Sequence, residues 1–237
     1  MGIKQRLLRS FFSRRTLRLI EFDLVRARTR RMSRSFDGDA SAFKGLHLGC
    51  GPRRVDGWLN VDVVGSDFDI DLGNGSLPFP DHSVNAIVSQ HTIEHLELRS
   101  ELLPLLSECC RVLRPGGRAW LSCPDLAKIC SSYVNERCES LVDGRQHRHS
   151  GDGRGGWSLD KESGLQGTPS SHMVNSVFYQ EGEHRNLFDF ELLAWLLRLA
   201  GFISVELSCE PYFRLAHPEF PSRGDSEQTL YVVAWKD

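Results

Sequence analysis

A repeating alternation of short apolar runs and amphipathic helical patterns is the feature that most constrains how this chain folds. It starts at Phe43 and continues almost to the C-terminus. Short apolar runs bounded by turn residues fit buried strands, and helical segments between such strands cover a mostly parallel sheet, so the order predicts an α/β fold. The expected strands are 46–48, 59–63, 86–89, 119–122, 202–207 and 229–235, the last two paired with each other. Helices are expected over 102–113 and 190–200, the second capped by Asp189.

Two segments depart from this alternation. Residues 1–35 contain eleven Lys or Arg and only two acidic residues, although the whole chain carries a net charge of −2. We therefore predict a basic N-terminal helical arm over 1–38 and a globular domain over 39–237. Within that domain, residues 143–171 are rich in glycine and poor in apolar side chains. This composition predicts a lid or a flexible loop.

The basic arm is compatible with two kinds of contact. Apolar residues within 3–12 fall on one side of a helix and basic residues fill much of the rest, a pattern typical of a peripheral membrane-surface helix. The pattern is not sustained beyond residue 16, so a helix that docks on the domain with a solvated basic face is the alternative. Nucleic acid is not expected as a partner, because basic charge alone does not select it.

Cysteine usage and hydropathy indicate the compartment. The seven cysteines include no CxxC pair, as in a reduced intracellular protein. No run of 18 apolar residues occurs, which excludes a spanning helix. His147 and His149 have no further ligand at metal-binding spacing. The sequence therefore predicts a cytoplasmic protein, with peripheral membrane association as an option, and no bound metal.

The first chemical signal is a strand that runs into a glycine turn, Gly49-Cys50-Gly51. Glycines allow a tight bend and a close approach of backbone to a ligand, although a tight turn after any buried strand looks similar. Asp62 lies near the end of the next strand, where a carboxylate can accept both hydroxyls of a ribose. Only ten residues separate Gly51 from Asp62, too few for the helix of a dinucleotide fingerprint, which disfavours NAD.

Several motifs then follow in a fixed order: LPFPD at 77–81, EHL at 94–96, RVLRPGG at 111–117 and HRNLF at 184–188. With their surroundings they closely resemble class I S-adenosylmethionine-dependent methyltransferases of the branch called methyltransferase type 11. The resemblance covers about residues 43–125 and returns more loosely over 184–208.

This resemblance implies a Rossmann-like, seven-stranded sheet with an antiparallel last strand, flanked by helices. It also implies S-adenosylmethionine as the cofactor, lying across the tips of the strands. The methionine end of the cofactor would face the glycine turn, and its ribose would face the acid at the end of the second strand. Its adenine would face the next acid and the backbone beside it, and its sulfonium would lie at the end of the fourth strand. The residues expected to bind it are Gly49, Cys50, Gly51, Asp62, Asp71, Leu72, Ser89 and Gln90.

Catalytic candidates follow the fourth strand. Transfer of a methyl group depends mainly on alignment of the reactants away from water, and a hydroxyl acceptor also needs a base for its proton. His91, Glu94 and His95 are the candidates, with His91 as the expected base. The alternative for Glu94 and His95 is a structural role in tying the segment to neighbouring backbone. His172 and His184 are candidates for contact with the acceptor.

Three functions therefore stay open on the sequence alone. The first is an active methyltransferase acting on a hydroxyl of a small molecule, a glycan or a lipid-linked acceptor. The second is a module of the same fold that binds the cofactor or a partner protein without catalysis. The third is an NAD-dependent enzyme, which a comparison of the nucleotides that stabilise the protein would distinguish.

Overall fold

The chain folds around one seven-stranded sheet. The computed structural model describes residues 11–32, 36–149 and 156–237, and its strand order is β3-β2-β1-β4-β5-β7-β6. Pairing is parallel from β3 through β5, whereas β7 is antiparallel to both β5 and β6. The strands are β1 (Leu46–Leu48), β2 (Leu59–Asp62), β3 (Phe68–Asp69), β4 (Val84–Gln90), β5 (Leu113–Pro124), β6 (Ser204–Ser208) and β7 (Thr229–Trp235).

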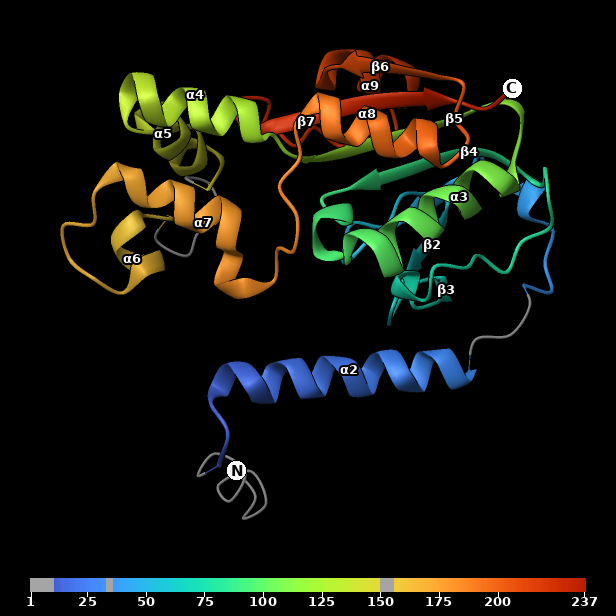
Figure 1. Ribbon diagram of the computed structural model, residues 1–237, viewed down its shortest axis with the longest axis horizontal. Coiled ribbons are helices and arrows are strands. Elements are labelled where there is room, and N and C mark those ends of the chain that lie inside the picture. Colours follow the sequence, from blue (N-terminus) through green and yellow to red (C-terminus); the bar gives the residue numbers. More distant parts are fainter. Residues whose placement is uncertain (1–10, 33–35, 150–155) are drawn as a thin grey trace.

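Helices lie on both faces of the sheet and in a lobe beside it (Figure 1). The α-helices are α2 (Arg14–Met32), α3 (Leu103–Val112), α4 (Leu126–Glu136), α5 (Glu139–Arg148), α6 (Leu159–Ser163), α7 (Met173–Tyr179), α8 (Phe190–Leu199) and α9 (Glu210–Ala216). Short turns of helix are η1 (Ala40–Ala42), η2 (Leu72–Asn74), η3 (Ile93–His95), the π-helical η4 (Leu98–Leu102), η5 (Ser170–His172) and η6 (Gln180–Gly182). Within the described ranges, every helix is too short or too polar to span a bilayer.

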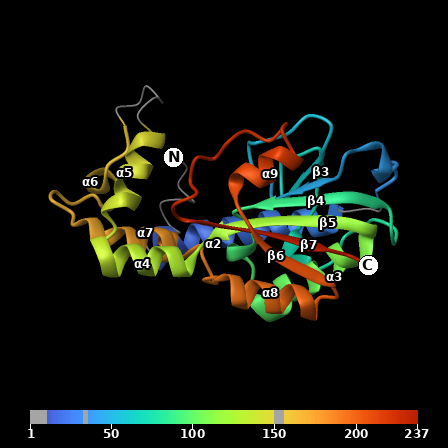
Figure 2. The same ribbon diagram turned by 90° about the horizontal axis from the view of Figure 1, so that it is seen from above.

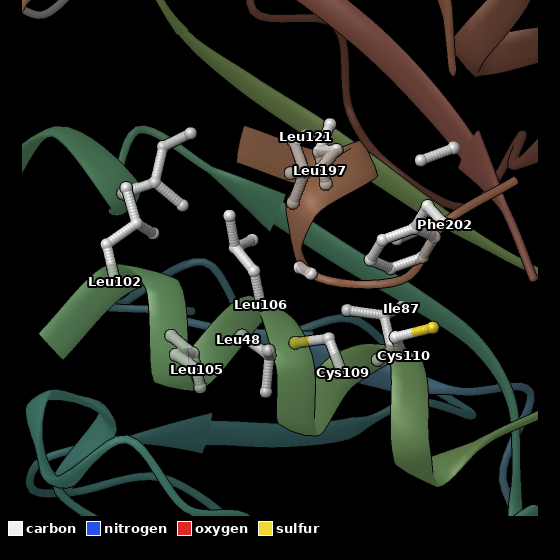
Figure 3. Packing of buried hydrophobic residues seen from close by; sticks show 14 of the residues in the cluster. Leu48, Ile87, Leu102, Leu105, Leu106, Cys109, Cys110, Leu121, Leu197 and Phe202 are labelled. Carbon is white, nitrogen blue, oxygen red and sulfur yellow. The ribbon is translucent and has the colours of Figure 1, made fainter. Parts of the chain in front are cut away.

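The main core lies between the sheet and the helix pair α3 and α8, which cover the same face (Figure 2). Helix α3 has Pro104 in its first turn, where a missing N–H costs nothing, and its apolar residues recur at helical spacing. Figure 3 shows Leu106 and Cys109 of α3 facing Ile87 of β4. Fully burying a leucine stabilises the fold by roughly 1.5–3 kcal/mol, so this layer supplies much of the folding free energy.

The opposite face is covered in an unusual way, because residues 49–58, all of them described, contain no helix between β1 and β2. The side chain of Asn60 holds this short connection instead: Oδ1 accepts from the Val55 N–H at 2.9 Å and Nδ2 donates to the Val55 carbonyl at 3.1 Å. Trp58 is buried against Phe220, with ring centroids 5.0 Å apart. Helix α9 and the chain after it therefore occupy the place that a crossover helix would fill (Figure 2).

Arg111 explains why two of the motifs occur together. Its guanidinium donates to the carbonyls of Leu77 and Phe79, both at 3.0 Å, and so fixes the segment that leads into β4. Glu108, one turn earlier on α3, and Asp81 accept further hydrogen bonds from it. Motif RVLRPGG thus supplies the donor that holds motif LPFPD in place.

The sequence-based expectations for the fold are confirmed in outline. Helix α8 has its expected N-cap, since Asp189 Oδ1 accepts from the Leu192 N–H. Strand β3 and the helices α4, α5, α6, α7 and α9 were not among the expected elements. Residues 143–171 do not form one loop: the end of α5, then α6 and η5 lie within the described part, because Leu141 and Leu159 find a buried apolar cluster beside the sheet. The proposed division at residue 38 stays a prediction.

Candidate functional site

A cavity of about 530 Å³ lies at the carboxyl ends of β1, β2 and β4. In open parallel sheets this edge, at the point where the strand order reverses, is where ligands bind, and the volume suits a ligand of cofactor size. One wall comes from the ends of the strands, and the other comes from α2 and the segment before α8. The lining residues are Arg18, Leu19, Phe22, Arg26, Gly49, Asp62, Val63, Asp71, Leu72, Gly73, His91, Thr92, His95, Leu96, Gly182, Glu183 and Arg185.

The glycine turn after β1 is held by backbone and by Asp62. Gly49 has φ of +69° and donates its N–H to the Val61 carbonyl at 2.8 Å. A β-carbon on Gly49 would lie 2.7 Å from the Cβ of Thr92 and still closer to its hydroxyl, so no other residue fits. Asp62 Oδ2 accepts from the Gly51 N–H at 2.7 Å, and Oδ1 accepts from the Val63 N–H at 2.6 Å. The acid at the end of β2 therefore also shapes the turn it faces.

Cys50, between the two glycines, does not line the cavity. Its side chain is buried, and burial raises the pKa of the thiol to about 11, so it stays protonated at neutral pH. All seven cysteines are free thiols. A nucleophilic role for Cys50 is therefore disfavoured.

Asp71, the acid expected at the adenine, is bound by the N-terminal helix. Both of its oxygens lie 3.0 Å from Arg26 Nε, and Oδ2 also accepts from Arg30 Nε at 2.5 Å. Arg26 reaches Glu101 as well, at 2.6 Å, and Thr29 of the same helix donates to the Val63 carbonyl at 2.7 Å. Asp71 is only 5% exposed. These contacts close the cavity on the α2 side. There the arginines of α2 pair with the buried Asp71 and the half-buried Glu101.

His91 directly follows β4 and has φ of +54°, a strained conformation for a non-glycine residue. Its Nε2 lies 3.3 Å from Asp225 and 3.2 Å from the Thr229 hydroxyl, and its Nδ1 lies 3.3 Å from Glu94 Oε1. Burial alone would lower the pKa of His91, but the two carboxylates outweigh it and raise that pKa above its usual value. The two acids therefore fix the orientation of the ring at the cavity wall.

Glu94 is buried behind His91 and His95. Burial opposes its ionisation, but the neighbouring His91 and His95 outweigh burial and lower the pKa of Glu94. Its backbone carbonyl accepts from the N–H groups of Arg185 and Asn186 at 2.8 and 3.2 Å, which brings the segment before α8 to the end of β4. His184 lies on that segment, and its ring packs edge-to-face on His95 with centroids 4.8 Å apart.

The structure thus places the predicted site residues in several groups. Of the cofactor candidates, Gly49, Asp62, Asp71 and Leu72 line the cavity, whereas Cys50, Gly51, Ser89 and Gln90 do not. Of the catalytic candidates, His91 and His95 line it and Glu94 lies behind them. The acceptor candidates separate: His184 joins His95, and His172 lines a second cavity of about 620 Å³.

Sequence reasoning missed the contribution of α2 to the cavity. Arg18, Leu19, Phe22 and Arg26 line it, together with Thr92 and Glu183. The uneven distribution of charge along the sequence could have revealed this contribution. A basic N-terminal segment on an otherwise acidic chain is expected to pair with carboxylates of the domain.

The residues at the strand ends fit S-adenosylmethionine. Asp62 supplies a carboxylate at the end of β2, the glycine turn leaves exposed backbone, and Leu72 and Val63 supply an apolar surface. Asp71 is already occupied by two arginines, so the backbone of η2 is the more available partner for an adenine.

Comparison with known proteins agrees with this geometry. Residues 65–121 match the family described as methyltransferase domain. A probable S-adenosylmethionine-dependent methyltransferase of Mycolicibacterium smegmatis is 37% identical over 79 residues, which covers 27% of this chain and 30% of that protein. The chain therefore matches only about a third of that relative.

Solved structures with related folds were also found. A methyltransferase from Archaeoglobus fulgidus has a TM-score of 0.47 and 16% identity, covering 99% of this chain and 100% of that one. One from Mesorhizobium loti has a TM-score of 0.41 and 19% identity, covering 89% and 96%. The strand order of the sheet, the motifs and the match over residues 65–121 together support a class I S-adenosylmethionine-dependent methyltransferase domain.

Proposed function

We propose that this chain transfers a methyl group from S-adenosylmethionine to a hydroxyl of a small molecule, a glycan or a lipid-linked acceptor. The observation that supports this most is the cavity of about 530 Å³ that joins the glycine turn, Asp62 and His91 in one space. It contains both the surface a nucleoside needs and ring nitrogens near the end of β4. A ligand-binding module without catalysis would need only the first.

In this proposal the ends of β1 and β2 bind the cofactor. Gly49 offers backbone to its methionine end, and Asp62 accepts from its ribose hydroxyls while it keeps the Gly51 N–H in place. When bound, the cofactor supplies a methyl group on a positively charged sulfur, which leaves as a neutral thioether. Helix α2 excludes water from the other side, and this favours a reaction in which charge is lost.

The acceptor side of the cavity is formed by His91, His95 and Glu183. A hydroxyl must lose its proton as the new carbon–oxygen bond forms, and the rings of His91 and His95 line the space where that proton would leave. The neutral amine of another acceptor would not need such a group. The histidines therefore favour oxygen over nitrogen as the methylated atom.

Thermal unfolding with saturating S-adenosylhomocysteine or NAD tests the cofactor site. A ligand at a hundredfold over its Kd stabilises the native state by about 2.7 kcal/mol, which raises the Tm measurably. We expect a shift with S-adenosylhomocysteine alone. Asp62→Ala removes charged hydrogen bonds worth roughly 1.5–3 kcal/mol each and should weaken binding at least tenfold. Asp69→Ala, an exposed acid one strand away, is the matched control and should bind normally.

The outcomes separate the alternatives. A shift with NAD alone would identify a dinucleotide enzyme, and no shift with either nucleotide would contradict the proposal. Binding of S-adenosylhomocysteine together with no labelled methyl transfer into any fraction of a cell extract would support the non-catalytic module.

A peripheral membrane contact is a second proposal, supported by the outer surface of α2. Ile20 and Leu24, one turn apart, are 40% and 65% exposed beside several arginines. Residues 1–10, which carry most of the expected surface helix, lie outside the described part of the chain. The full chain should co-sediment with anionic but not neutral vesicles at low salt.

Leu24→Asp should reduce that sedimentation, and Leu207→Asp on exposed β6 should not. Equal sedimentation of all three proteins, or none of the wild type, would refute the contact.

A further inference from the structure

Three potential metal ligands meet beside the cavity. Glu94 and His95 come from η3 and His184 from the segment before α8, and one ligand atom from each lies within 4.8 Å of the others. The pairing is built by backbone as well as side chains: Arg185 and Asn186 donate to the Glu94 carbonyl, and the Asn186 amide donates to the Leu96 carbonyl at 2.5 Å. The fold therefore holds these two distant segments together at this point.

The carboxylate of Glu94 is buried beside His91 without a well-formed hydrogen bond. It is 1% exposed, and among the described residues neither of its oxygens accepts a hydrogen bond. His91 Nδ1 lies 3.3 Å from Oε1 and is its nearest ion-pair contact among the described residues. Because a buried carboxylate is costly while its hydrogen-bonding positions are unfilled, Glu94 has capacity to bind a further cation beside His91.

The two histidines have nitrogens arranged for coordination. His95 Nδ1 lies 3.3 Å from the Glu183 carbonyl, and a hydrogen bond there puts the proton on Nδ1 and leaves the lone pair on Nε2. His184 Nδ1 is buried and has no hydrogen-bond partner among the described residues. The Glu183 carbonyl fixes the His95 ring through Nδ1, and His184 Nδ1 has a lone pair that no hydrogen bond uses. Each histidine therefore offers one nitrogen to a metal ion.

We propose that Glu94, His95 and His184 bind a divalent transition-metal ion. Two imidazoles and one carboxylate form a donor set that suits zinc, cobalt or iron in the divalent state. Metal–ligand bonds of about 2.1 Å put donor atoms roughly 3.4 Å apart, so small side-chain rotations complete the site from its present spacing. This departs from the expectation of no metal, because that expectation considered spacing along the sequence and not residues 90 positions apart.

The ion would face the cavity. His95 and Glu183 line it together with His91, so a fourth coordination position opens toward the space assigned to the acceptor. Three protein ligands and one open position are the arrangement of a catalytic rather than a structural site. This placement of the acceptor rests on the proposed methyl transfer, whereas metal binding itself does not. An acceptor oxygen on the ion would be oriented and would lose its proton more readily.

Titration of the chelator-treated full chain with CoCl₂ tests the site without cofactor or acceptor. We expect visible Co²⁺ absorption that saturates at roughly one ion per chain and is displaced by ZnCl₂. His184→Ala and Glu94→Gln should each weaken binding at least tenfold. His147→Ala removes an exposed histidine outside the cluster and should bind as the wild type does.

Absence of saturable absorption in the wild type, or equal binding by the wild type and the His184→Ala variant, would overturn the proposal. If Glu94→Gln does not fold, His184→Cys decides: a thiolate ligand should restore binding with an altered spectrum. Because S-adenosylhomocysteine binding is measured separately by thermal unfolding, failure of the metal site and failure of the proposed function are distinguishable.

Discussion

Replacing Gly49 by alanine is expected to lower the free energy of unfolding by roughly 2–5 kcal/mol and to abolish binding of S-adenosylhomocysteine. A left-handed conformation costs a residue with a side chain about 1–2 kcal/mol, and forcing a methyl group against packed atoms adds about 1–3 kcal/mol. Both apply here, because Gly49 has φ of +69° and its added Cβ would overlap Thr92. Urea denaturation measures the first effect and thermal shift with the ligand the second.

Gly51→Ala is the matched control for this prediction. Gly51 also has positive φ, +52°, but an added Cβ would meet nothing within 4 Å. Only the conformational cost of about 1–2 kcal/mol should remain. If both variants lose the same stability, the contact with Thr92 does not determine the shape of the turn.

Arg26→Met is expected to destabilise the protein by roughly 3 kcal/mol, since it breaks the ion pair with the buried Asp71 and leaves that carboxylate only partly compensated. Asp71 would keep only Arg30, and Glu101 would lose its contact at 2.6 Å. Cofactor binding should weaken as well, because α2 forms one wall of the cavity. Urea denaturation and ligand titration check the two effects.

Arg28→Met on the exposed side of the same helix serves as the control and should change stability by less than about 0.5 kcal/mol. Combining Arg26→Met with Asp71→Asn should recover part of the loss, because the unpaired charge is then removed. Strictly additive effects of the two changes would show that the pair is not coupled, and α2 would then be anchored elsewhere.

The sequence predicted the strands that are buried on both faces. Strands β1 and β7 have the expected bounds because short, mostly apolar runs mark them. Strand β3 has two residues, one of them exposed, and carries no periodic signal. Helix α9 escaped notice because it is short and exposes Tyr212 and Leu215, so its pattern does not look amphipathic.

The candidate site was predictable where it depends on the ends of strands. Gly49 and Asp62 follow β1 and β2 directly, and parallel strands bring their carboxyl ends to one edge of the sheet. The contribution of α2 was not predictable. A carboxylate more than 40 residues away, Asp71, binds Arg26 and so determines which face of α2 docks on the domain. The meeting of His95 with His184 depends likewise on backbone contacts between distant segments.

The short connection between β1 and β2 has a consequence for how the chain is made. Trp58 and Val88 are covered by Phe213, Phe220 and Tyr231, which are synthesised more than 120 residues later. During translation this apolar face stays open until residues 213–231 have emerged, and closing such long loops is slow. The half of the sheet formed by β1, β2 and β4 therefore cannot finish folding before the C-terminal strands. A nascent chain stalled before residue 210 exposes this apolar surface, which chaperones bind.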